Sequence, residues 1–187
     1  MSDINRARDQ IGRVGASLFD RELTSGTSGN ISVRLDDGGW LMTPTNIALG
    51  TLDPARLSRF DGDFQLLDGD APTKEAFLHF SMYAERSDAA AVVHMHSSHS
   101  TAVSILRDVD PDDVLPALTA YYIMRIGRLP LVPYFAPGDP DLAHAVRALA
   151  GRHHAILLAN HGLSSRAHRC STRNPRSRSW RRRQSCF

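Results

Sequence analysis

The chain has 187 residues, of which 42% are hydrophobic and 22% charged, a composition that suits one globular domain with a substantial core and excludes wholesale disorder. No apolar run approaches the ~20 residues that a helix needs to cross a bilayer, and the N-terminal stretch lacks the continuous apolar segment of a secretion signal. We therefore expect a cytoplasmic protein.

The net charge of +2 combines an acidic body with a basic C-terminal segment. Residues 1–163 carry 14 basic side chains against 20 acidic ones, a net charge of −6. Residues 164–187 carry 8 Arg and no acidic residue, a net charge of +8. Because a nucleic-acid-binding domain needs a folded basic face, the acidic body predicts neither a nucleic acid nor a membrane as its partner.

The first half of the chain begins with apolar residues at helical spacing, which predict an amphipathic helix. Turn residues then separate short strands, and Pro44 ends one of them because proline cannot donate to a strand ladder. The predicted elements are a helix over 1–19, a loop at 24–30, strands at 31–35 and 40–42, a short helix or turn at 53–61, and a hairpin arm at 64–70.

The second half alternates helical patterns with short apolar strands. This alternation predicts an α/β domain in which helices cover a sheet. The predicted elements are a helix from its cap Thr73 to about Arg86, a buried strand at 89–96, a helix from Ser98 to about Leu106, an ambiguous apolar stretch at 115–126, an extended piece at 131–134, a helix at 139–150 and a buried strand at 155–161.

Residues 164–187 form a segment without helical or strand periodicity, and both cysteines, Cys170 and Cys186, lie in it. It could be a basic arm that binds nucleic acid or membrane, a solvated tail without a specific role, or the product of a reading frame lost just after His161 and Gly162. The abrupt change of composition favours the lost frame. We therefore predict one domain over 1–163 and a disordered or out-of-frame tail over 164–187.

Three histidines are candidate metal ligands. His94 and His96 are two residues apart on a predicted strand, so their side chains point to the same face and can reach one cation. Two polar residues at the exposed end of a strand would show the same pattern. His161 ends another predicted strand beside Asn160 and Gly162, and three histidines with an open position are typical of a catalytic zinc site.

Other histidines are weaker candidates. His79, on the helix that follows Thr73, is a competing ligand, whereas His99 lies beyond the strand of His94 and has no need to join it. The remaining ones considered are predicted to lie on the surface: His144, His153 and His154.

Polar residues near the start of the helix at Thr73 are candidates for acid–base chemistry and for anion binding. Glu75 is either a carboxylate that compensates the helix dipole or a general acid/base that also touches the metal. Backbone N–H groups and a cation at a helix N-terminus hold anions, and Gly/Ser/Asn loops are either phosphate nests or ordinary turns. The residues concerned are Gly29, Asn30, Thr45, Asn46, Thr73 and Lys74.

The order of five motifs resembles the class II aldolase/adducin family: TSGNISVR, MTPTNI, PTKEAFLH, AVVHMHSSHSTAVS and LLANHG. The resemblance covers residues 1 to about 162. It implies a three-layer α/β/α sandwich with a largely antiparallel central sheet, and commonly a homotetramer with active sites between subunits. It also implies one Zn²⁺ per subunit, in a site that could take another divalent metal.

The resemblance also assigns roles to residues. It implies that His94, His96 and His161 are zinc ligands, and that Glu75 is the acid/base residue and coordinates zinc in the resting enzyme. It places the substrate phosphate at the following positions: Gly29, Asn30, Thr45, Asn46, Thr73 and Lys74.

Within the family, two features are closer to the 3-oxo-tetronate 4-phosphate decarboxylases than to the sugar-phosphate aldolases. Thr73 and Lys74 stand where the aldolases tend to have two serines. The later segment YYIMRIGRLPLVPYFAPGD also resembles the decarboxylases more than the aldolases. Both reactions pass through an enediolate that stands beside the metal, so the metal motif alone does not separate them. The alternatives are therefore an aldolase or epimerase of this family acting on a sugar phosphate, and a non-catalytic adducin-like module.

Overall fold

The computed structural model describes residues 3–136 and 139–167. Both cysteines and most of the Arg-rich segment that was predicted to be a tail lie outside these residues. Within the described residues the helices are α1 (Asp3–Asp20), α2 (Ala76–Glu85), α3 (Ser98–Ser104), α4 (Ala120–Arg125) and α5 (Asp141–Ala150), with 3₁₀ turns η1 (Leu49–Thr51) and η2 (Pro54–Arg56). The strands are β1 (Asn30–Arg34), β2 (Trp40–Met42), β3 (Ser58–Phe60), β4 (Leu66–Asp68), β5 (Ala91–Met95), β6 (Leu131–Val132), β7 (Ala155–Leu158) and β8 (Leu163–Ala167).

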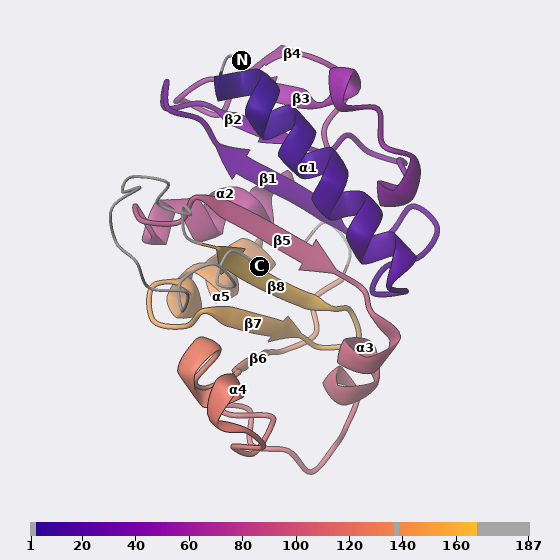
Figure 1. Cartoon of the computed structure of the whole chain (residues 1–187). Coiled ribbons are helices and arrows are strands. Elements are labelled where there is room, and N and C mark those ends of the chain that lie inside the picture. The colour runs from indigo at the N-terminus through magenta and orange to yellow at the C-terminus, as the bar shows by residue number, and fades with distance from the viewer. Residues whose placement is uncertain (1–2, 137–138, 168–187) are drawn as a thin grey trace, which may run out of the picture.

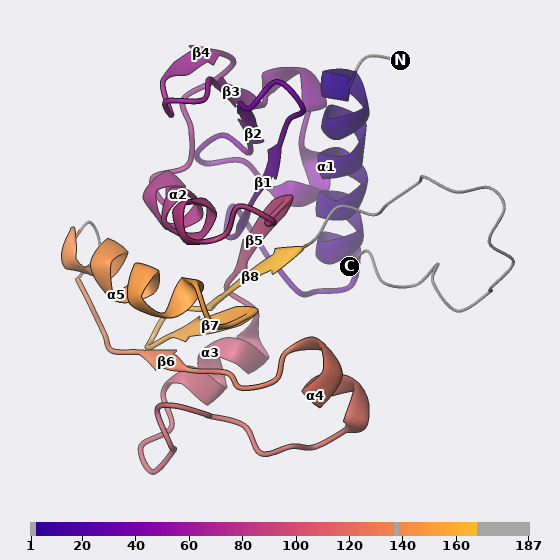
Figure 2. The same cartoon turned by 90° about the vertical axis from the view of Figure 1, so that its left-hand side faces the viewer.

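One sheet contains all of these strands, in the order β4-β3-β2-β1-β5-β8-β7-β6. The β6–β7 pair is parallel and every other neighbouring pair is antiparallel. Figure 1 shows α1 in front of β1 and β2, with α2 and α5 behind the sheet, and Figure 2 shows these two helical layers on opposite sides. The predicted α/β/α fold with a largely antiparallel sheet is confirmed.

Alternation along β5 assigns neighbouring side chains to two different apolar clusters. In β5, Val92 joins a cluster with Leu78 and Met82 of α2, whereas Val93 joins a cluster with Ile11 of α1. Successive side chains of a strand point to opposite faces, so β5 contributes to both helical layers. The same rule places Asn30, Ser32 and His94 on the α2 side, which positions polar residues beneath that helix.

Two segments differ from the sequence prediction in the first half of the chain. Residues 58–60, predicted as part of a short helix or turn, form strand β3, because β2 on one side and β4 on the other supply the hydrogen bonds that so short a segment cannot supply itself. Thr73 was predicted as the helix cap, but the cap position is Glu75 and the helix begins at Ala76.

The last described residues include a strand that the sequence patterns did not predict. The predicted boundary at residue 163 falls inside β8, which continues to Ala167 and lies between β5 and β7. The sequence Leu-Ser-Ser-Arg-Ala contains no β-branched or aromatic residue, so its composition gives no strand signal. Hydrogen bonding from a strand on each side imposes the extended conformation. Residues 163–167 therefore form a strand inside the sheet.

Across the described residues, none of the helices has both the length and the apolar character that crossing a membrane requires.

Candidate metal centre

Four side chains converge at one end of the sheet, on the α2 side. They are Glu75, His94, His96 and His161, and one ligand atom from each lies within 4.8 Å of the others. Sequence positions up to 86 residues apart are thus brought to one point. All four residues were predicted as metal ligands, and the structure places them together.

The imidazoles present the same nitrogen to the centre of the cluster. Nε2 of His161 lies 2.8 Å from Oε1 of Glu75, Nε2 of His94 lies 3.5 Å from it, and Nε2 of His96 lies 3.7 Å from it. The ring planes are nearly perpendicular to one another, at 76°, 82° and 83°. The rings therefore surround one point with their nitrogens, and do not stack.

Local structure explains the positions of His94 and His96. His94 lies in β5, fully buried, and His96 follows one residue after the strand ends, half-buried. Ser97 then caps α3 by accepting a hydrogen bond from the backbone N–H of Ser100. The backbone is thus fixed on both sides of His96.

His161 lies in a turn and not at the end of a strand as predicted, because β7 ends at Leu158. Asn160 adopts a positive φ of 55°, which closes the turn, and the Thr101 hydroxyl donates a hydrogen bond to the His161 carbonyl. A Cβ atom added to Gly162 would lie 2.2 Å from the Met95 carbonyl oxygen. The turn can therefore pack against the end of β5 only because residue 162 is glycine.

The charge state of the cluster follows from its surroundings. Burial alone would raise the pKa of the Glu75 carboxyl, but its interactions with the imidazoles of His161, His94 and His96 outweigh burial and lower it far below its usual range. Burial also lowers the pKa of His94, against the opposing effect of Glu75. At neutral pH the site thus contains a carboxylate and a neutral, fully buried imidazole.

This donor set fits a divalent metal. Nε2 of His94 and Nε2 of His96 are 2.9 Å apart, and only one of them can carry the hydrogen between them. Neutral imidazole nitrogens and a carboxylate oxygen are ligands that zinc takes in proteins. The residues that would hold it are those of the cluster.

Some of the residues predicted to bind a phosphate adjoin the cluster, since Asn30 contacts Glu75 and Thr73. The loops that carry Thr45 and Thr73 run side by side, since Pro44 and Pro72 form an isolated β-bridge. Lys74 and Asn46, on these two loops, are exposed. Gly29, with φ of 79°, lies against the His94 carbonyl.

Asn30 has protein partners for its whole side chain. Its Nδ2 donates to Oε2 of Glu75 at 2.6 Å and to the hydroxyl of Thr73 at 3.2 Å, and its Oδ1 lies 2.5 Å from Nε2 of His79. Sequence reasoning placed Asn30 among phosphate-binding residues and did not find this link to Glu75.

His79 does not join the cluster that it was predicted to compete for. It is fully buried between α2 and β1, and its two ring nitrogens have protein partners, Asn30 and Ser32. His144 is exposed as predicted, whereas His153 and His154 are half-buried.

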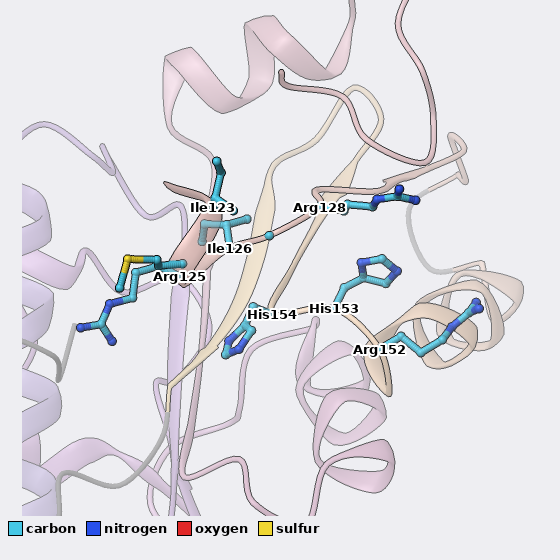
Figure 3. A pocket seen from close by; sticks show the side chains of 9 residues that line it. Ile123, Arg125, Ile126, Arg128, Arg152, His153 and His154 are labelled. Carbon is cyan, nitrogen blue, oxygen red and sulfur yellow. The ribbon is translucent and has the colours of Figure 1, made fainter. Parts of the chain in front are cut away.

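A separate surface hollow of about 310 Å³ lies between the end of α4 and the turn before β7 (Figure 3). Figure 3 shows Ile123 and Ile126 on one segment and His153 and His154 on the other. None of the cluster residues lines it. The hollow therefore contributes nothing to the candidate metal centre.

Comparison with known proteins agrees with this site. Residues 9–169 match the Class II Aldolase and Adducin N-terminal domain. The chain is 46% identical over 162 residues to the 3-oxo-tetronate 4-phosphate decarboxylase of Cupriavidus necator, covering 87% of this chain and 74% of that protein. It is 38% identical over 143 residues to the L-fuculose phosphate aldolase of Escherichia coli K12, covering 75% and 63% respectively.

The crystal structure of Escherichia coli YgbL superposes with a TM-score of 0.86 at 41% identity, covering 88% of this chain and 80% of that one. The match to the family covers most of the chain, including β8, and the motifs that carry the resemblance supply the clustered side chains. The chain therefore belongs to the class II aldolase and adducin family.

Proposed function

We propose that the chain is a decarboxylase that converts a 3-oxo-tetronate 4-phosphate to dihydroxyacetone phosphate and CO2, with zinc as its metal. The observation that carries the proposal is the Glu75 and three-histidine cluster in a chain 46% identical to a decarboxylase of that name. The broader class is a metal-dependent lyase of the class II aldolase family, as the sequence predicts.

The chemistry of a 3-oxo acid suits this site. Its carbonyl is β to the carboxylate, so departure of CO2 leaves an electron pair that is shared between C2 and the oxygen on C3. A divalent metal held by His94, His96 and His161 would supply Lewis acidity toward the oxygens of the substrate. What remains for the protein is to move a proton to C2.

Glu75 is the residue for this proton transfer. Because its carboxyl is ionised in the fold, it first acts as a base and takes the proton of the C2 hydroxyl. After CO2 has left, it returns that proton to carbon C2 of the enediolate. The alkoxide then takes one proton from water, so the reaction consumes one proton overall.

The phosphate would lie at the edge formed by the loops of Thr45 and Thr73. Lys74, which is exposed there, provides the positive charge, and backbone N–H groups near Gly29 provide hydrogen bonds. This arrangement would hold the substrate so that its C2 and C3 face the cluster.

The 38% identity to L-fuculose phosphate aldolase supports an aldolase as the second candidate. An aldolase forms the same enediolate but expels an aldehyde, and it can also yield dihydroxyacetone phosphate. A non-catalytic adducin-like role is disfavoured, because an interaction module has no use for three converging imidazoles and a carboxylate.

The test is CO2 release from 3-oxo-tetronate 4-phosphate by the zinc-loaded protein. We expect metal-dependent release that His94→Ala abolishes and Glu75→Gln lowers by about 10²–10⁴-fold, the range for a general acid/base. Folded, zinc-loaded protein that releases no CO2 but cleaves a ketose 1-phosphate would overturn the decarboxylase in favour of the aldolase.

A further inference from the structure

A chain of buried hydrogen bonds leads from the cluster into the interface between α2 and β1. It runs from Glu75 to Asn30, then to His79, Ser32 and Tyr83. The successive donor–acceptor distances are 2.6, 2.5, 2.7 and 2.8 Å. Apart from Glu75 at its outer end, each member is buried, with at most 4% of its surface exposed.

The spacing of these residues explains why the chain is continuous. Glu75, His79 and Tyr83 recur every four residues along α2, which advances ~6 Å. Asn30 and Ser32 recur every two residues along β1, which advances ~6.7 Å. Because the two repeats nearly match, helix and strand supply alternate members of one ladder.

The chemistry of each group fixes the direction of every hydrogen bond. The Glu75 carboxylate can only accept, so the Asn30 atom next to it is the amide nitrogen, and Oδ1 of Asn30 must face His79. Oδ1 can only accept, so Nε2 of His79 carries the hydrogen.

The inner half of the chain follows from this tautomer. His79 is fully buried, and burial lowers its pKa to about 3, so the ring is neutral and Nδ1 can only accept. Ser32 must therefore donate its single hydroxyl hydrogen to His79. The Tyr83 hydroxyl, whose pKa is raised by burial, donates to Ser32 and ends the chain.

We propose that Asn30, His79, Ser32 and Tyr83 form a positioning relay that holds Oε2 of Glu75 and thereby aims Oε1 at the three imidazoles. His79 is a positioning residue in the Nε2–H tautomer and not a ligand. Outer residues that orient metal ligands change metal affinity or activity by about 10–100-fold when removed. The relay rests on the proposed function, in which Glu75 transfers the proton. The tests of the relay require no substrate.

The first experiment is nitrogen-15 NMR of the histidine rings in the metal-free full chain near neutral pH, with the His79 signals identified by their absence in His79→Gln. We expect a neutral His79 ring with its hydrogen on Nε2. A ring with its hydrogen on Nδ1, or a protonated ring, would overturn the proposed direction of the relay whether or not the chain is a decarboxylase.

The second experiment measures Zn²⁺ affinity in a double-mutant cycle. His79→Phe removes both hydrogen bonds, and we expect the affinity to fall about 10–100-fold. Combined with Glu75→Ala, His79→Phe should cause no further loss, because the relay acts only through that carboxylate. An equal loss in both backgrounds would show a merely structural role and overturn the proposal.

Two variants serve as controls. His79→Gln keeps an N–H donor toward Asn30 and should keep most of the Zn²⁺ affinity, so a folded His79→Gln protein as weak as His79→Phe would contradict the relay. His144→Phe makes the same change at an exposed position of α5 and should leave the affinity unchanged.

Discussion

Lys74 is the one lysine of the sequence, and it stands exposed in the loop that leads into α2, beside Thr73 and Glu75. A cation at this place can face the phosphate or the carboxylate of the substrate. Its neighbours in the proposed phosphate site are uncharged. The charge on Lys74 therefore offers a way to separate substrate binding from proton transfer.

We expect Lys74→Ser to raise KM for 3-oxo-tetronate 4-phosphate about tenfold, as loss of a hydrogen bond to a charged group predicts. Lys74→Arg keeps the positive charge and should recover most of the affinity. Steady-state kinetics of CO2 release for both variants measure the effect. Unchanged kinetics in Lys74→Ser would remove this residue from the substrate site.

The two histidines at the end of β5 were predictable from sequence, whereas links between elements were not. His94 and His96 were identified because a strand repeats every two residues, and the apolar run before His161 located the third histidine. The relay depends on how β1 and α2 are aligned in space, which neither element determines alone. The four-residue spacing of Glu75, His79 and Tyr83 was the available signal.

At the scale of elements, the turn between β7 and β8 determines where His161 lies. Gly162 meets the backbone of β5 so closely that no side chain fits. We expect Gly162→Ala to displace the turn, to weaken Zn²⁺ binding, and to lower the free energy of unfolding by about 1–3 kcal/mol, as overpacking does. Urea unfolding and Zn²⁺ titration measure the two effects.

Gly62→Ala is the matched control, because its added Cβ would meet only the Gly38 carbonyl oxygen, at 3.8 Å. This variant should bind Zn²⁺ like the original chain. If Gly162→Ala did the same at unchanged stability, the close contact with β5 would not position His161.

The strands illustrate how far composition determines an element. Apolar β5 and β7 were predicted, while β3 and β8 were missed because three residues, or a Ser-Ser-Arg sequence, have no preference strong enough to detect. In β8, Ser164 is buried opposite His94. The extended conformation of β8 comes from its pairing with β5 and β7. A pattern along one segment of sequence does not report such neighbours.

At the scale of the whole molecule, the buried neutral His79 makes stability depend on pH. Its pKa falls from 6.5 to about 3 in the fold, so between these values the unfolded chain binds a proton that the folded chain does not. The free energy of unfolding should therefore decrease as pH falls through this window, by ~1.4 kcal/mol per pH unit for this residue.

Urea unfolding of the metal-free protein at several pH values measures this dependence. His79→Gln removes the titrating group and should give a shallower slope below pH ~6.5, while exposed His144→Gln should keep the original slope. Parallel curves for His79→Gln and the original chain would show that His79 is protonated in the fold.

The position of β8 has a consequence for how the molecule is assembled. It is the last strand that the structure describes, yet it lies inside the sheet, where it joins β1–β5 to β7 and β6. Without β8, β5 and β7 would each lack one neighbour in the sheet, and open edges invite pairing with other chains. β8 covers both of these edges. The turn that leads into β8 brings His161 to Glu75, His94 and His96, which lie earlier in the sequence. The segment that places the third histidine of the metal centre is thus the same one that joins the two parts of the sheet.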